Sequence, residues 1–135
     1  ANAQLYRSVV ITLTAAQVKA LFTTPRTLVT APGSGKVALI HGILFASTFL
    51  TTAYAGANAL EFRYTNGSGA KVSADIANTT LNFSSGTRYA YVAGVTTELQ
   101  AVANAAVVVC VPTANPTLGD SIVKLTVIYS IVTAP

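Results

Sequence analysis

Charged residues are scarce in this sequence. Asp, Glu, Lys and Arg make up 9% of the 135 residues, whereas hydrophobic residues make up 52%. Ordinary soluble domains contain about 25% charged residues. An isolated monomer of this composition would have few charges to keep it in solution, and extensive apolar surface usually marks an interaction site. The composition therefore favours a single domain whose surface is partly covered by copies of itself or by a larger assembly.

Cysteine, histidine and acidic residues are too few to build the common catalytic or metal sites. The lone cysteine, Cys110, excludes an internal disulfide framework, and its valine neighbours predict a small buried hydrophobe. The only histidine, His41, would need further metal ligands or a positioned acid. No acid shares a recognisable spacing with it, so we predict a structural histidine, no catalytic residue, no metal, no cofactor and no enzyme activity. The acids are Glu61, Asp75, Glu98 and Asp120.

The basic residues are spread along the chain. The eight Lys and Arg residues give a formal net charge of +4. They form no basic cluster with interleaved aromatic residues, which is the pattern typical of nucleic-acid binding. Polar residues interrupt the charge-free stretches 37–60 and 99–119, which argues against insertion into a membrane. We therefore expect no nucleic acid, membrane or small-molecule substrate as partner, and a mild attraction to acidic surfaces.

One glycine-rich stretch, TAPGSGKVALIHG at 30–42, has the look of a phosphate-binding loop. Such a loop needs an initial glycine, a hydroxyl directly after its lysine and a following helix. Thr30 stands where the glycine is required and Val37 where the hydroxyl is required, and the residues that follow favour a strand. The stretch therefore predicts a tight turn that leads into a buried strand beginning at Lys36.

Hydrophobic residues recur at every second position in much of the chain, which is typical of half-buried antiparallel strands. Near the N-terminus, Val9, Ile11 and Leu13 share one face. Near the C-terminus, the apolar face runs from Val123 to Ile131. Further strands are expected at 26–30, 36–46, 81–83, 87–93 and 106–112.

One short helix is expected after the first strand. Thr14 and Gln17 have the spacing of a capping box, in which each side chain bonds to the backbone N–H of the other residue. Pro25 limits the helix to about two turns. Together these elements predict an all-β protein, a two-sheet antiparallel β-sandwich of the jelly-roll kind, formed by residues 9–135 after an N-terminal arm at 1–8.

Residues 60–74 predict a β-hairpin. Two apolar strand faces stay on the same side only if the loop between them has an odd number of residues, so we predict a three-residue loop at 67–69 with Gly69 at positive φ. The apolar face is expected to comprise Leu60, Phe62, Tyr64, Val72 and Ala74.

Four stretches carry a resemblance to a known family: ITLTAAQVKALFTTPRTLVTAPGSGKVALI, LEFRYTNGSGAKVSADI, YAYVAGV and ANAAVVVCVPTANPTLGDSIVKLTVIY. Together they are similar to small virion-associated proteins of tailed bacteriophages. The resemblance implies a virion structural protein, since some similar small β-sandwich proteins are capsid decoration (cement) proteins bound as trimers on the shell. It implies no catalytic residue.

The resulting hypothesis is a capsid decoration protein that forms a homotrimer, binds the major capsid protein and lies on the capsid surface of a virion assembled in the host cytoplasm. The alternative is a tail or fibre-tip module that binds a host glycan. The tyrosines could line a sugar site, but their strand positions favour packing in the core or in an interface. Candidate assembly contacts lie in the N-terminal arm: Asn2, Gln4, Leu5, Tyr6 and Arg7.

Overall fold

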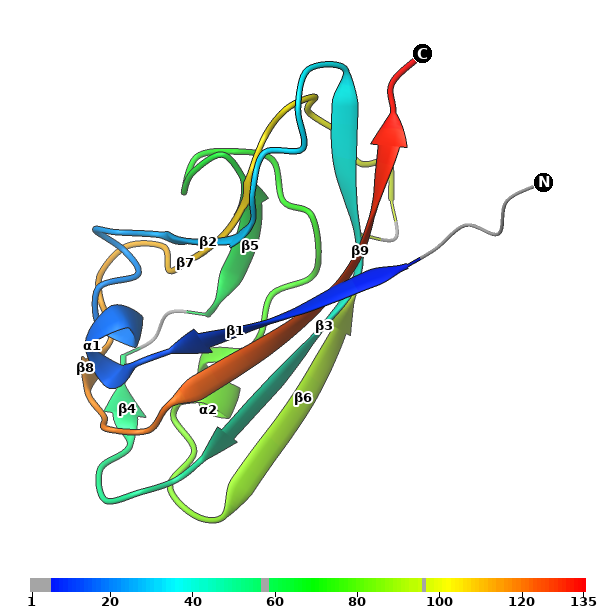
Figure 1. Cartoon of the computed structure of the whole chain (residues 1–135). Helices are drawn as coiled ribbons and strands as arrows, with labels where there is room; N and C mark the ends of the chain where they lie inside the picture. Colours follow the sequence, from blue (N-terminus) through cyan, green and yellow to red (C-terminus); the bar gives the residue numbers. More distant parts are fainter. Residues whose placement is uncertain (1–5, 57–58, 96) are drawn as a thin grey trace.

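Two antiparallel sheets pack against each other in the computed structural model, which describes residues 6–56, 59–95 and 97–135. The larger sheet has the strand order β1-β9-β3-β6 and the smaller has the order β2-β7-β5 (Figure 1). A short third ribbon pairs β4 with β8. The strands are β1 (Arg7–Leu13), β2 (Arg26–Val29), β3 (Lys36–Thr48), β4 (Tyr54–Ala55), β5 (Glu61–Tyr64), β6 (Thr87–Ala93), β7 (Val107–Cys110), β8 (Thr117–Leu118) and β9 (Val123–Thr133). The predicted antiparallel β-sandwich is confirmed.

The core lies between the two sheets. Every second residue of β9 from Val123 to Val127 is fully buried, and Phe62 and Tyr64 of β5 meet them from the smaller sheet. The Tyr64 hydroxyl donates a hydrogen bond to the Ala38 carbonyl at 2.6 Å. This bond lets a large aromatic side chain fill the core without leaving its hydroxyl unsatisfied.

β3 contains a bulge that the alternating pattern did not reveal. Its register with β9 shifts between Ile40 and Gly42, which leaves His41 as the extra residue. Because one residue is inserted, the side chains that face the core change from even to odd positions. Ile40 before the bulge and Ile43 after it are therefore both buried.

The glycine-rich stretch forms the predicted turn. Lys36 begins β3, and the turn before it is closed by the hydrogen bond from Lys36 N–H to the Gly33 carbonyl at 3.1 Å. Gly33 has a φ of 109° and donates its N–H to Asn104 Oδ1 at 3.0 Å. The backbone N–H of Gly33, which could otherwise donate to a phosphate, is thus bound to a side chain of the same protein.

Two short helices accompany the sheets. In α1 (Ala15–Val18) the predicted capping box is present, with Thr14 Oγ1 and Gln17 Oε1 each accepting a backbone N–H of the other residue. The helix is a single turn followed by irregular turns, which is shorter than expected. α2 (Asn78–Leu81) falls where we expected the strand at 81–83, so that prediction was wrong. In the described ranges, no helix has the length and hydropathy required to span a membrane.

Two details explain why 81–83 is not a strand and why the hairpin differs from its prediction. Asn82 donates its side-chain amide to the Gly56 carbonyl at 2.7 Å, which ties the end of α2 to the loop after β4. In the hairpin, Tyr64 N–H bonds to the Ala70 carbonyl, so the loop is longer than three residues. Asn66 Oδ1 accepts the N–H of Ser68 at 2.8 Å and builds the turn locally.

The hairpin prediction therefore needs two corrections. Thr65, with a φ of 69°, occupies the left-handed region, whereas Gly69 does not. Val72 is buried as predicted, but Ala74 is exposed, because the register shifts between the Arg63–Lys71 and Leu60–Ile76 bridges and Ser73 bridges to Gly94 instead. A local polar side chain, rather than glycine alone, determined the turn.

We expect Asp120→Asn to destabilise the fold in a pH-dependent way. The carboxylate accepts the Thr51 hydroxyl and the backbone N–H groups of Thr51 and Thr52, and these bonds hold the pKa of Asp120 below its ordinary value of 3.8. Because the pKa of Asp120 is lower in the folded state than in the unfolded state, the carboxylate stabilises the fold at pH values above the unfolded pKa. This stabilisation is lost as the pH falls through the folded pKa.

Urea unfolding at neutral pH should therefore show a lower midpoint for Asp120→Asn than for the wild type. The difference should shrink as the pH falls below 3.8 and vanish once the pH is below the lowered folded-state pKa. Glu98→Gln is the matched control, because the described contacts of Glu98 are limited to the exposed side chain of Gln100. A midpoint difference that persists unchanged in acid would contradict this account.

Candidate functional site

The strongest candidate for a functional surface is the outer face of the larger sheet, meaning the face turned away from β2, β7 and β5. Pairing across the sheet arranges its side chains in rows that cross all four strands. The rows are Ser8, Ile128, Gly42 and Ala93; Val10, Thr126, Leu44 and Tyr91; and Thr12, Lys124, Ala46 and Tyr89. Lys124 is the single charged residue in these rows.

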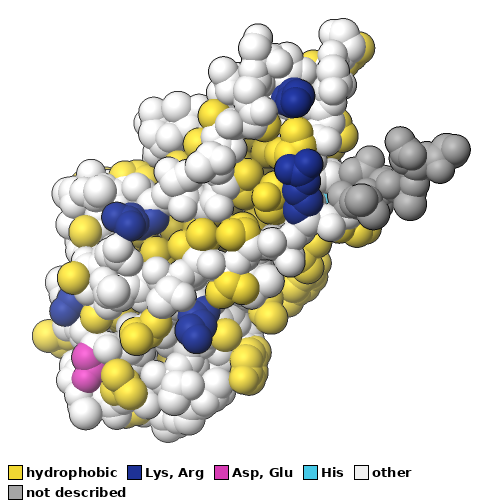
Figure 2. Space-filling model, in the orientation of Figure 1, with side chains coloured by type: hydrophobic (Ala, Val, Ile, Leu, Met, Phe, Trp, Pro, Cys, Tyr) yellow, Lys and Arg dark blue, Asp and Glu magenta, His cyan; other side chains and the backbone are white. Residues whose placement is uncertain are grey.

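Large hydrophobic side chains on this outer face are open to solvent. Tyr89 is 68% exposed, Tyr91 is 58% exposed and Val10 is 57% exposed. Scattered exposed hydrophobic residues are normal on soluble proteins, but a contiguous group marks a contact surface. In Figure 2 hydrophobic side chains run in a band across the visible surface and along the side formed by β6.

One end of the outer face is built around the β3 bulge. His41 Nε2 lies 2.9 Å from Ser130 Oγ, and the Tyr6 ring lies 4.5 Å from the His41 ring. The Tyr91 ring lies against Gly42, where a Cβ atom would overlap the phenol. Glycine is therefore required at 42 for this aromatic side chain to lie flat on the sheet. His41 thus lies in β3 and contacts residues of its own chain.

The opposite end of the outer face opens into a shallow groove. Leu50 and Ile122 lie on the loops that flank it and are 56% and 48% exposed. Ser47 at its base donates its hydroxyl to the Ile122 carbonyl at 2.8 Å. The groove is lined by Ala46, Ser47, Thr48, Leu50, Thr87, Tyr89, Ile122 and Lys124. It continues the apolar surface past the end of the strands.

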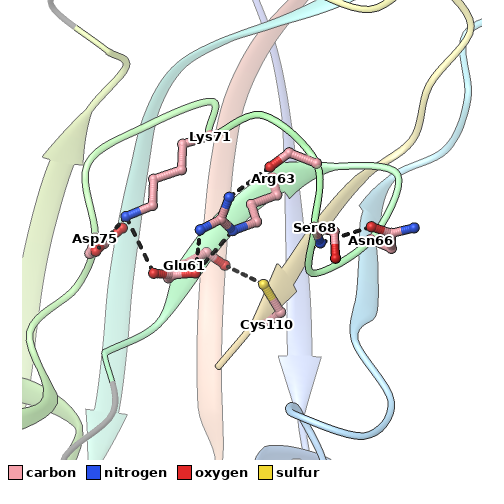
Figure 3. A network of polar contacts seen from close by, with 8 residues as sticks. Glu61, Arg63, Asn66, Ser68, Lys71, Asp75 and Cys110 are labelled. Atoms are coloured by element: carbon pink, nitrogen blue, oxygen red, sulfur yellow. Dashed lines mark hydrogen bonds and ion pairs between the residues drawn. The ribbon is translucent and has the colours of Figure 1, made fainter. Parts of the chain in front are cut away.

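A polar network lies on the other side of the molecule, over β5 and β7 (Figure 3). Glu61 Oε1 accepts from the Arg63 guanidinium at 2.9 Å, and Glu61 Oε2 lies 3.3 Å from Lys71 Nζ. Lys71 also pairs with Asp75 at 3.0 Å. Arg63 donates a second bond to the Gly69 carbonyl at 2.7 Å. The network holds the long hairpin loop against the smaller sheet.

The groups in this network are poorly suited to catalysis. The hydrogen bond to Asp75, together with that to Glu61, raises the pKa of Lys71, so its amine stays protonated and is no nucleophile. Burial raises the pKa of the Cys110 thiol, which is 2% exposed and donates to the Glu61 carbonyl at 3.7 Å. Among the described residues, no group of three or more His, Cys, Asp or Glu side chains could hold a metal ion.

The acidic side chains are largely occupied by contacts within the chain. Glu61 and Asp75 are ion-paired, and Asp120 is bound to the 51–52 backbone. In the part of the chain that the structure describes, six basic residues have no ion pair: Arg7, Lys19, Arg26, Lys36, Arg88 and Lys124. The surface is therefore weakly positive, and Figure 2 shows basic side chains scattered singly with acidic ones at one place.

Two of the five predicted contact residues in the N-terminal arm lie within the described part of the chain. Asn2, Gln4 and Leu5 lie outside the described residues. Tyr6 packs on His41, and Arg7 belongs to β1, where it pairs with Tyr129.

The outer face was not predicted from the sequence, because period-two alternation alone does not say which sheet face is covered. The run of aromatic residues at alternate positions in TRYAYVA was the available signal.

The tyrosines divide between core and surface. Tyr54 and Tyr64 are buried, and the Tyr54 hydroxyl donates to the Ser121 carbonyl. Burial, with the nearby charge of Asp120, raises the pKa of Tyr54 to about 12. Tyr6, Tyr89 and Tyr91 are exposed on or beside the outer face. Their exposure supplies a surface for contact with another molecule.

We expect Glu61→Gln to lower the free energy of unfolding by about 1.5–3 kcal/mol, the usual contribution of a hydrogen bond to a charged group. The Glu61 side chain is only 10% exposed and neutralises two cations. Asp75→Asn, at a side chain that is 31% exposed, should cost less. Urea unfolding of both variants tests this, and equal losses would show that burial does not govern the network.

Comparisons with known proteins do not assign a family. No protein-family model matches the chain, and no curated protein matches it. Among solved structures, a chain of the cyanophage Pam1 capsid asymmetric unit is similar with a TM-score of 0.43 and 22% sequence identity. The match covers 96% of this chain and 82% of that chain. Values of this size establish neither a shared fold nor a shared function.

Proposed function

We propose that the protein is a structural component of a tailed-phage virion and serves as a decoration (cement) protein on the surface of the capsid, assembled in the host cytoplasm. The observation that carries the proposal is the outer face of the larger sheet, which is apolar, exposed and charged only at Lys124. The sequence resemblance to small virion-associated proteins supports the same role.

The outer face favours a permanent assembly over an isolated monomer. Each square ångström of apolar surface removed from water contributes about 25 cal/mol. Covering side chains such as Tyr89, Tyr91 and Val10 is therefore favourable, and few charges must lose their hydration when the face is covered. A shell offers many identical sites, so modest contacts by each copy add up by multivalency.

The proposed partners are two further copies of this chain and the major capsid protein. A ring of three identical chains can meet three surrounding shell subunits equivalently at a threefold position. The basic residues without ion pairs, including Lys124 on the outer face, complement an acidic surface on the shell. Tyr6 and Arg7 lie at the start of β1, where the arm can extend such a contact.

Catalysis has no part in the proposed function. Three observations support this: the carboxylates of Glu61 and Asp75 are bound by cations, the Cys110 thiol is buried, and His41 bonds to Ser130. None of these groups is free in the described structure to act as a base or nucleophile on a bound substrate.

Glycan binding at a tail or fibre tip is the alternative, and the exposed rings of Tyr89 and Tyr91 favour it. Sugar recognition also needs convergent polar groups beside the aromatic platform. The cross-strand neighbours of these two tyrosines on β3 are Ala46 and Leu44, which supply no side-chain hydrogen bond. The hydroxyls in the groove beside Tyr89 bond within the chain, Thr48 with Thr87 and Ser47 with the Ile122 carbonyl. The outer face is therefore better suited to a protein surface than to a glycan.

The proposal predicts that charge placed at the groove end of the outer face abolishes binding to the shell. Leu50→Asp and Ile122→Asp should each fail to sediment with heads of the phage that encodes the chain, whereas the wild type sediments with them. A carboxylate buried in an apolar contact without a partner is strongly unfavourable. Circular dichroism should show both variants folded, because both side chains are exposed.

Val102→Asp is the matched control. Val102 is also exposed, at 41%, but lies in the segment between β6 and β7. It should bind heads like the wild type. Retention of binding by all three variants, or binding to a host glycan with no binding to heads, would overturn the proposed function.

A further inference from the structure

Among residues 6–56, 59–95 and 97–135, no strand pairs along the full length of either outer edge of the larger sheet. The strand order places β1 at one edge and β6 at the other, and Figure 1 shows β6 at the outer side of the sheet. Within the described residues, β6 is covered only at the end formed by Ala93 and Gly94, by the hydrogen bond from Ala74 N–H to the Ala93 carbonyl and by the bridge to Ser73. The remainder of each edge strand is available to pair with another strand.

The hydrogen-bonding pattern identifies the free backbone groups of β6. The β3–β6 ladder is bracketed by the bonds from Phe49 N–H to the Gly86 carbonyl and from Gly94 N–H to the His41 carbonyl. Hydrogen-bonded and non-hydrogen-bonded pairs alternate in an antiparallel ladder. The N–H and C=O groups of Arg88, Ala90 and Val92 therefore point to β3. Those of Thr87, Tyr89 and Tyr91 point outward.

The same alternation, followed through β3 and β9, applies to β1. Gly42, Leu44 and Ala46 bond to β9, so Leu125 and Val127 bond to β1. The N–H and C=O groups of Ser8, Val10 and Thr12 are therefore directed away from the sheet. The two opposite edges of the sheet carry matching sets of free groups, and both sets belong to residues of the outer face.

Most of the features that usually prevent pairing are missing from both edge strands. Edge strands are commonly protected by proline, lysine, a bulge or an inward-pointing charge. The sequences RSVVITL and TRYAYVA contain no proline, lysine or acid. β6 has one inward-pointing charge, Arg88, but its guanidinium lies 5.5 Å from the centre of the Phe83 ring, so it is engaged within the chain.

We propose that β1 of one copy pairs with β6 of the next copy, so that the larger sheets join into a closed ring. The proposal rests on the trimer of the proposed function and names its interface. In the matching register, Val10 lies opposite Tyr89 of the next copy, Ser8 opposite Tyr91 and Thr12 opposite Thr87. All three pairs are hydrogen-bonded pairs, and their side chains share the outer face.

A second copy fits these edges better than an unrelated strand. The sheet is antiparallel throughout, so β1 and β6 run in opposite directions and meet antiparallel in neighbouring copies. The register places no like charges opposite each other, since Arg88 faces Ile11 across the interface. Pairing of two different edges is a heterologous contact, which can close into a ring such as the proposed trimer, whereas pairing of β6 with itself gives only dimers.

Engineered disulfides test the register directly. Cα atoms of a hydrogen-bonded pair are about 5.5 Å apart, which is within the range that a disulfide spans. The double variant Val10→Cys/Tyr89→Cys should form covalent trimers under mild oxidation, seen on a non-reducing gel. The single variants should not cross-link, because the cysteine at position 10 then lies opposite Tyr89 and the cysteine at position 89 lies opposite Val10. Cys110 is 2% exposed and does not take part.

A cross-link in Tyr89→Cys alone would show pairing of β6 with itself and overturn the proposal. Covalent dimers as the end product, an open ladder of higher species, or no cross-link in the double variant would also overturn it. Sedimentation of Tyr89→Pro provides a second test, because proline removes an outward N–H that the fold itself does not use. This variant should sediment as a monomer, while Tyr89→Phe stays a trimer.

Head binding separates this inference from the proposed function. A wild-type trimer joined at β1 and β6 that does not bind heads would leave the interface standing and end the shell role. A wild-type monomer that binds heads would end the interface and leave the shell role. Circular dichroism of Tyr89→Pro confirms that the loss of the trimer is not a loss of the fold.

Discussion

The antiparallel pairing of β3 with β9 is the constraint on which the rest of the structure depends. The two strands pair from Lys36 and Thr133 at one end to Ser47 and Val123 at the other. Because side chains alternate across a strand, burial of one side of this ladder against the smaller sheet determines which residues the other side presents. β1 pairs with β9 and β6 pairs with β3, so their side chains are divided between the core and the outer face in the same way. The apolar outer face is a direct consequence.

The bulge at His41 adjusts this ladder locally. By inserting one residue, it allows Ile40 and Ile43 both to reach the core, and it brings His41 beside Ser130. Gly42 then leaves room for the Tyr91 ring on the outer face. A single irregularity thus serves the core on one side of the sheet and shapes the candidate contact surface on the other.

Acidic and basic side chains have different places in the structure: most acids are bound within the chain, whereas most basic residues have no ion pair among the described residues. Three of the four acids hold loops in place: Glu61 and Asp75 bind the hairpin loop, and Asp120 binds the backbone of Thr51 and Thr52. The unpaired charges of the described chain are mostly basic and lie apart from one another. The field around the molecule is therefore more positive than the spacing of charges in the sequence suggests, and an acidic protein surface is the partner that it complements.

Patterns of short range were readable from the sequence. The alternation in β1, β6 and β9, the capping box of Thr14 and Gln17, and the turn before Lys36 are each set by neighbours within a few residues, and all of them are present in the structure. The sandwich itself followed from the number and spacing of such strands. Local chemistry that competed with these patterns was missed. Asn66 lengthened the hairpin turn, and Asn82 anchored a helical turn where a strand was expected.

The amino-acid pattern is sufficient to predict an antiparallel β-sandwich with little charge and no recognisable catalytic motif. The packing of the two sheets, which the sequence does not reveal, places Tyr89 and Tyr91 on an open face and Tyr54 and Tyr64 in the core. The reason is physical: alternation fixes that successive side chains point to opposite faces, but which face is covered depends on the sheet that packs there. Strand order likewise decides that β1 and β6 are the open edges, because pairing partners are distant in sequence.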